Sequence, residues 1–356
     1  MKKIISYSLA VGIFSSVVIT PFGSTLAASP KVESLISTAE KHAGVLKWEI
    51  SYEQTKAIKK PDMKVFNATK SSYLQAQKEI SKASGPEKKE LEKRLEENVG
   101  VHYKRTMGYI DAITSGNKIF ALTKQFEQQY AENPVADSTE KTYHELSAEI
   151  RKQAKLLYKV YGKSTRDAFL SKYKAPAELV LDNAKYTVTA KNDLRKLNTL
   201  VSQQANAIVI NKQLNQLFDS LDQIVEDEIY YSLFDQYIAI IRKDPSFIAQ
   251  EKELKEFFVK ANDLWNNENV EGIFNLYSTE YPYYDTLKND IQDTFAELNL
   301  RYELLNVETY SIINDYAYVE VTELLKVDSK SEEITSFYLM KKENNEWKYA
   351  DFIDGY

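Results

Sequence analysis

A stretch near the middle of the chain, Arg151–Lys174, has the residue types that capture an anionic polymer. It contains eight lysines and arginines against one anion, Asp167, with three tyrosines and a phenylalanine between the cations. Cations attract negative charge over a Debye length of about 8–10 Å, and tyrosine faces can stack on sugar rings. The pattern therefore predicts a polysaccharide-binding surface. Its candidate residues are Lys152, Lys155, Tyr158, Lys159, Tyr161, Lys163, Arg166, Lys172 and Tyr173.

A structural interpretation of the same stretch stays open. In it the lysines only solvate one face of a helix, while Tyr158, Tyr161 and Phe169 fill the core of a helical bundle. Most of the chain's 25 tyrosines are expected to pack in this way, with the hydroxyl at the rim. Burial of every tyrosine in the stretch would remove the basis for polysaccharide binding.

The sequence lacks the motifs of metal sites and of common enzymes. Its three histidines are isolated on separate predicted helices, and it has no cysteine, no G-x-S-x-G and no nucleotide-binding glycine loop. We therefore predict no enzyme activity, no cofactor and no metal site. A pocket enzyme in the C-terminal region stays an alternative, with Asp285 and Asp290 as its acid and base.

Charge is divided unequally along the chain. Residues 28–215 carry a net charge of +10 and residues 216–356 carry −18; two lysines near the start bring the total to −6. A basic first half fits an anionic partner. The strongly acidic second half, together with predicted export, argues against nucleic acid as that partner.

The first 27 residues have the layout of a secretory signal peptide. Lys2 and Lys3 precede a largely apolar run, and small residues lead to a predicted cleavage site after Ala27. The run is shorter than the roughly 20 residues that cross a bilayer, so we expect no membrane span after cleavage. No L-P-x-T-G sorting motif occurs, and a lipid anchor would need a cysteine. We therefore expect a secreted protein that is held non-covalently.

The first half of the chain is predicted to be helical. Apolar residues recur every three or four positions within 32–59, and a further helix is predicted from Asp137 or Ser138 to a C-cap at Gly162. Ser164 is the expected cap of the next short helix. Apolar periodicity through 194–238 predicts long helices in a bundle or coiled coil, with the boundaries around 192–206 left open.

The pattern changes after about residue 250. Residues 251–278 and 283–300 predict three amphipathic helices, and alternation in 315–327 and 333–353 predicts strands, with a polar turn at Glu343–Glu346. The fold class is therefore mainly α, with a small α+β domain that has an antiparallel sheet. The predicted domains are 1–27 (signal peptide), 28–245 (all-α) and 250–356 (α+β).

The segments "YKVYGKSTRDAFLSKYK", "AEKHAGVLKWEISYEQT" and "GYIDAITSGNKI" resemble the amino-terminal wall-binding region of the SbsC family of surface-layer proteins. The resemblance covers about residues 39–192, and its most distinctive part is the core "VYG-x-STR". It implies elongated three-helix bundles with long connecting helices, which attach to the secondary cell wall polysaccharide of a Gram-positive bacterium. The long set of β-domains that forms the family's array is not found in this sequence, so the resemblance does not extend to lattice formation.

The last hundred residues resemble the SnoaL-like or nuclear-transport-factor-like superfamily, through the order of their elements and the ending "YLMKKENNEWKY". This resemblance implies a cone-shaped domain of helices and a curved sheet. Enzymes and binding domains share that fold, so it decides no function.

The predicted function joins these parts: an exported protein bound through its helical half to an anionic secondary cell wall polymer. Its C-terminal domain would bind a small ligand or another surface protein. Two alternatives stay open, namely a secreted helical scaffold without polysaccharide binding and the pocket enzyme.

Overall fold

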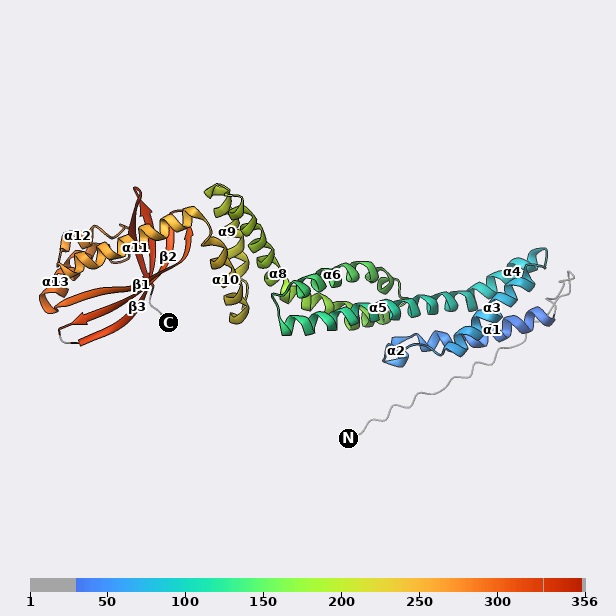
Figure 1. Cartoon of the computed structure of the whole chain (residues 1–356). Coiled ribbons are helices and arrows are strands. Elements are labelled where there is room, and N and C mark those ends of the chain that lie inside the picture. The colour runs from blue at the N-terminus through green and yellow to red at the C-terminus, as the bar shows by residue number, and fades with distance from the viewer. Residues whose placement is uncertain (1–29, 329, 354–356) are drawn as a thin grey trace, which may run out of the picture. The chain divides into compact units, whose positions relative to one another are not determined.

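The computed structural model describes residues 30–328 and 330–353 (Figure 1). The predicted signal peptide lies outside the described residues. The chain is mainly helical and ends in a four-stranded antiparallel sheet, which confirms the predicted fold class. None of its described helices is long and apolar enough to cross a membrane.

The helices and π-helical turns (η) are α1 Pro30–Glu49, α2 Tyr52–Thr55, α3 Met63–Ile80, α4 Pro86–Leu95, η1 Glu96–Gly100, α5 Val101–Glu132, α6 Asp137–Tyr158, α7 Lys163–Phe169, η2 Leu170–Lys174, α8 Ala175–Ser202, α9 Ala207–Leu221, α10 Asp227–Ile241, α11 Pro245–Asn266, α12 Val270–Phe274 and α13 Tyr284–Glu297; the strands are β1 Leu300–Ile313, β2 Tyr316–Val327, β3 Lys330–Glu343 and β4 Glu346–Ile353.

The chain forms two compact units. Unit 1 contains the described residues up to Lys118 together with Lys152–Lys174, and unit 2 contains Ile119–Arg151 together with the described residues from Ala175 onward. Helices α5 and α6 each contribute to both units. This division differs from the predicted boundary at 245–250, because one hydrophobic core continues from α8 through α11 into the sheet. The predicted domain limits stay a prediction.

One hydrophobic core of unit 1 is formed by α1, α3, α4, η1 and the start of α5. Its buried apolar residues recur at the helical spacing expected for a face that packs inward. Arg94 of α4 holds α1 through two hydrogen bonds to the Glu40 carboxylate, of 2.9 and 2.8 Å, and a third of 2.6 Å to Glu33. Two parallel donors on one carboxylate fix both distance and orientation, so this pair sets how α4 lies on α1.

Two predictions about helix ends in unit 1 are wrong. The helix predicted over 32–59 ends at Glu49, because Ser51 is extended and the backbone N–H of Tyr52 donates to the Thr165 hydroxyl of α7 (3.1 Å). Gly162 does not cap the preceding helix. That helix ends at Tyr158, and Gly162 precedes α7 with φ of 85°, a region that favours glycine. The three residues between them let Val160 enter the core.

Unit 2 joins a helical layer to the sheet. Helix α8 packs on α9 and α10, and α11 packs on β1 and β4 (Figure 1). The strands run in the order β1-β2-β3-β4, and β2 alternates buried and partly exposed residues as predicted. Asn344 and Asn345 have positive φ at the predicted polar turn between β3 and β4. The boundary left open around 192–206 falls between Ser202 and Ala207, where the Asn206 side chain accepts a hydrogen bond from Val209 N–H.

Candidate functional site

The predicted binding residues lie at the end of α6, in the segment that follows it, and on α7 and η2, all within unit 1. Leu157, Val160 and Phe169 are buried and hold this segment in the core. Tyr158 and Tyr161 point away from that core, with 52% and 58% of their surface exposed. The interpretation in which both tyrosines fill a bundle core is therefore wrong for these residues and correct for Phe169.

Tyr161 is held by a cation from another helix. The guanidinium carbon of Arg105, on α5, lies 3.2 Å from the centroid of the Tyr161 ring. A guanidinium over a ring face is attracted by the ring's quadrupole, which favours one orientation of both side chains. The contact therefore places an oriented aromatic ring and a positive charge together at the surface.

Several cations near these tyrosines have no acidic partner. Among the described residues, Lys155, Lys159 and Arg166 form no ion pair, whereas Lys163 pairs with Asp167 at 2.5 Å. Lys155 is exposed on the last turn of α6, and Lys152, which is exposed one turn earlier, does not count among these unpaired cations. Because unpaired cations are not neutralised locally, this part of unit 1 presents a net positive charge to a ligand.

The prediction that Tyr173 belongs to the binding surface is wrong, because Tyr173 lies in the core with 4% of its surface exposed. Its ring packs against Gly116 of α5 so closely that an added Cβ would lie 2.4 Å from a ring carbon. The ring of Tyr173 is therefore not available to stack on a polymer, although the sequence pattern had indicated such stacking. Its neighbour Lys172 is exposed, and its Nζ donates to the Ile58 carbonyl at 3.4 Å.

A groove separates the α2 segment from α7 and η2. It has a volume of about 630 Å³, within the range of ligand sites. Ser164, predicted as a helix cap, instead donates to the Glu53 carboxylate (2.8 Å) and so helps to hold α2 beside α7. The groove is lined by Tyr52, Lys56, Ala57, Ile58, Ser164, Asp167, Ala168, Ser171 and Lys172.

Sequence reasoning missed one aromatic residue of this unit. Trp48 is 54% exposed at the end of α1, and the Nζ of Lys47 lies 5.0 Å from its ring centroid. Burial, and then the charges of Arg105 and Lys47, lower the pKa of His102, so both cations act on one imidazole. The sequence pattern does indicate that Trp48 is exposed, because it falls outside the apolar stripe that Ala39, Ala43 and Leu46 form.

The predicted acid and base of a pocket enzyme do not face an interior. Asp285 and Asp290 are both exposed on α13, and Asp290 accepts a hydrogen bond from Thr286 (2.9 Å). The buried carboxyl of the sheet region is instead Glu323 on β2, with 5% of its surface exposed. Its burial raises its pKa, and the nearby Asn262 side chain opposes that rise.

Comparison with known proteins confirms the resemblance of the helical half to SbsC. Residues 47–178 match the family described as "SbsC C-terminal domain". A relative, an S-layer protein of Geobacillus stearothermophilus, is 27% identical over 177 residues, which are 46% of this chain and 14% of that protein. The chain therefore spans only a small part of the curated relative that it matches.

The C-terminal region matches a different family, "Anti-sigma-I factor RsgI9, C-terminal domain", over residues 256–353. The SnoaL-like resemblance of this region stays a prediction. Among solved structures, the N-terminal part of the bacterial S-layer protein SbsC aligns with a TM-score of 0.43 and 17% identity, covering 91% of this chain and 72% of that one. A protein of unknown function with a cystatin-like fold from Nostoc punctiforme aligns with a TM-score of 0.24 and 13% identity, covering 28% of this chain and 85% of that one.

Proposed function

We propose that this chain is an exported surface protein without enzyme activity, which attaches through unit 1 to an anionic secondary cell wall polysaccharide. The observation that supports this most is the exposure of Tyr158 and Tyr161 beside the unpaired cations Lys155, Lys159 and Arg166. Trp48 and Arg105 extend the same combination of ring and cation onto α1 and α5. The similarity of residues 47–178 to the SbsC family agrees with this surface role.

Binding would proceed in two physical steps. The unpaired cations attract the polymer from a distance, and this attraction weakens as salt shortens the Debye length from about 10 Å at 0.1 M to about 3 Å at 1 M. The exposed rings then contact sugar faces over short range, and that contact depends little on salt. The sheet domain of unit 2 would stay available for a small ligand or another surface protein.

Co-sedimentation of the protein with purified wall sacculi tests this proposal. We expect retention on intact sacculi and little retention after the secondary polymer has been extracted. Equal retention on intact and on extracted sacculi would contradict the proposal and favour the alternative of a secreted helical scaffold. High salt should reduce the retention several-fold.

A matched pair of variants locates the binding surface. The triple variant Lys155→Ala/Lys159→Ala/Arg166→Ala should lose about tenfold or more in affinity, since each cation contributes to the same field. The control variant Lys243→Ala/Lys260→Ala/Lys330→Ala removes three cations of unit 2 that form no ion pair among the described residues. It should bind as the unmodified protein does. Equal losses in both variants would show that only total charge matters.

A further inference from the structure

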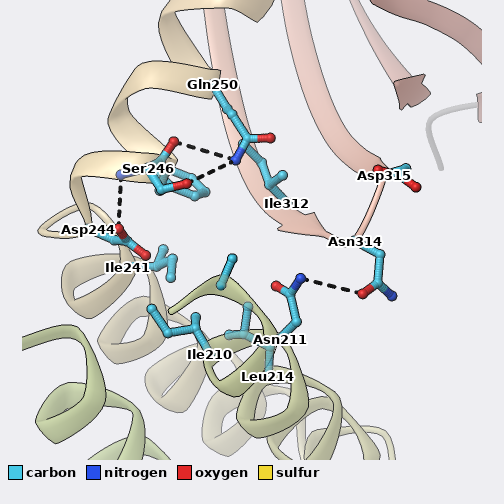
Figure 2. A pocket seen from close by; sticks show the side chains of 12 residues that line it. Ile210, Asn211, Leu214, Ile241, Asp244, Ser246, Gln250, Ile312, Asn314 and Asp315 are labelled. Carbon is cyan, nitrogen blue, oxygen red and sulfur yellow. Dashed lines mark hydrogen bonds between the residues drawn. The ribbon is translucent and has the colours of Figure 1, made fainter. Parts of the chain in front are cut away.

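A second, separate pocket lies within unit 2, where α9, the end of α10, the start of α11 and the β1–β2 turn meet (Figure 2). We call it the junction pocket; its volume is about 370 Å³. It is lined by Ala207, Ile210, Asn211, Leu214, Ile241, Asp244, Ser246, Phe247, Gln250, Ile312, Asn314 and Asp315. A cavity of this size accommodates a small ligand such as a monosaccharide.

The junction pocket has an apolar floor and a polar rim. Five of its aliphatic and aromatic residues are less than a tenth exposed and belong to the core of unit 2: Ile210, Leu214, Ile241, Phe247 and Ile312. Figure 2 shows polar side chains around that floor, with Asp244 and Asp315 on opposite sides. An apolar floor beneath convergent polar groups is the usual construction of a small-molecule site.

The rim offers both donors and acceptors. Asn211 donates to the Asn314 side-chain oxygen at 3.4 Å, and Gln250 makes only long contacts of 3.4 and 3.5 Å with Ser246. Each of the three amides therefore keeps hydrogen-bonding capacity for a ligand. Ligand hydroxyl groups, which donate and accept, match such a set of amides.

The charge of the rim selects among such ligands. Asp244 and Asp315 line the pocket, and no lysine, arginine or histidine is among its lining residues. Eight of its twelve lining residues also belong to residues 216–356, which carry a net charge of −18. An anionic ligand would be repelled, whereas an ammonium group gains a charge-assisted hydrogen bond to a carboxylate.

Two of these polar residues also have structural roles, and two do not. Asp244 caps α11 by accepting from Ser246 N–H (2.9 Å), and Asn314 has φ of 54° in a turn, a conformation that asparagine tolerates. Asn211 and Gln250 lie within helices, where neither capping nor turn geometry requires them. Their convergence on one pocket from α9 and α11 is the feature that points to a ligand.

We propose that the junction pocket binds a small amino sugar, with its hydroxyl groups on the amides, its ammonium group on a carboxylate and its apolar face on the floor. This goes beyond wall attachment, because it concerns another unit and the opposite charge preference. Failure of either proposal leaves the other unaffected.

Titration of the full chain with three sugars of one ring size tests this inference, by calorimetry or ligand-observed NMR. We expect D-glucosamine to bind with a dissociation constant of the order of 1 mM. D-Glucose should bind about tenfold more weakly, because it lacks the charge-assisted hydrogen bond. D-Glucuronate should not bind. Equal affinity for glucose and glucosamine, or no saturable binding of glucosamine, overturns the proposal.

Matched variants locate the site. Asn211→Ala and Asp315→Asn should each weaken glucosamine binding at least about fivefold. Asn215→Ala changes the same residue type one turn further along α9, and Asp328→Asn changes an aspartate in the turn between β2 and β3; neither residue lines the pocket. Both control variants should bind as the unmodified protein does. Unchanged binding by Asn211→Ala and Asp315→Asn would place the sugar elsewhere and refute the assignment.

Discussion

The surface of unit 1 and the sheet of unit 2 use the same residue type in opposite ways. Tyr158 and Tyr161 of unit 1 are more than half exposed, and Arg105 covers the second ring. Tyr349 on β4 is 6% exposed, and its ring centroid lies 4.8–5.8 Å from those of Phe257, Phe258, Tyr277 and Tyr338. A tyrosine-rich composition thus supplies a binding surface in one unit and a core in the other.

The charged residues differ in the same way. The Glu40 carboxylate of unit 1 is matched by two hydrogen bonds from Arg94, which together with Asn98 lower its pKa. Glu323 of unit 2 is buried and forms no ion pair among the described residues, so its pKa is raised. The first carboxyl therefore favours folding when it is charged, and the second favours folding when it is neutral.

The largest difference in stability is expected between alanine variants of a buried and an exposed tyrosine. Tyr349→Ala removes a ring from a packed aromatic cluster and should cost about 3–5 kcal/mol of unfolding free energy. Tyr161→Ala should cost less than about 1 kcal/mol, because its ring is mostly in water, and should weaken wall binding instead. Urea denaturation, monitored by tryptophan fluorescence, measures the loss of unfolding free energy in Tyr349→Ala, since Trp265 and Trp347 both lie in unit 2. A large stability loss in Tyr161→Ala would remove the contrast.

A second prediction concerns the packing of Tyr173. Gly116→Ala would place a Cβ 2.4 Å from the Tyr173 ring, so overpacking should destabilise unit 1 by about 1–3 kcal/mol. Gly108→Ala on the same helix is the control, because its new Cβ meets nothing within 4 Å. That variant should gain about 0.5–1 kcal/mol, the usual advantage of alanine over glycine inside a helix. Thermal unfolding followed by circular dichroism separates the two, and equal stability would disprove the packing of Tyr173 on Gly116.

The contributions of Glu323 and Glu40 to stability should depend on pH in opposite ways. Because the pKa of Glu323 is raised in the folded state, its contribution to stability is present below the unfolded value of 4.5 and is lost as pH rises through the folded pKa. Glu323→Gln should therefore be more stable than the unmodified protein at pH 7, by about 1 kcal/mol, and this difference should vanish near pH 4.

Glu40→Gln should show the reverse. The folded pKa of Glu40 is lowered, so its contribution is present above 4.5 and is lost as pH falls through the folded pKa. The Glu40→Gln variant should be less stable than the unmodified protein at pH 7. The difference in unfolding free energy between the two proteins should become smaller as the pH falls. Urea denaturation at pH 4, 5.5 and 7 measures both variants. The same sign for both would contradict the distinction between a paired and an unpaired carboxyl.

Sequence patterns predicted what depends on periodicity. The helical first part, the strands of β2 to β4 and the turn near Asn344 follow from spacing and local turn chemistry, and the structure has them. Patterns could not separate Tyr161 from Tyr173, because both stand among lysines. Their difference depends on Gly116 and Arg105, which lie 57 and 56 positions away in the chain. The junction pocket was missed for the same reason, since Asn211 and Asn314 are 103 residues apart.

The smallest predicted effect is also the sharpest test of the surface comparison. Trp48 of unit 1 and Phe120 of unit 2 are both about half exposed, and each has a lysine nearby: Lys47 Nζ at 5.0 Å and Lys124 Nζ at 5.8 Å from the ring centroids. Lys124 is also paired with Glu127 at 2.5 Å, so its charge is neutralised locally.

If the polymer recognises an exposed ring beside free positive charge, Trp48→Ala should weaken retention on sacculi by about two- to fivefold, equivalent to about 0.5–1 kcal/mol. Phe120→Ala should leave retention unchanged, because its ring stands beside a paired lysine. Neither variant should change the unfolding free energy by more than about 0.5 kcal/mol, since both side chains are largely solvated. Equal losses of retention would mean that exposed rings bind the wall without regard to their cations, and the electrostatic part of the proposal would then fail.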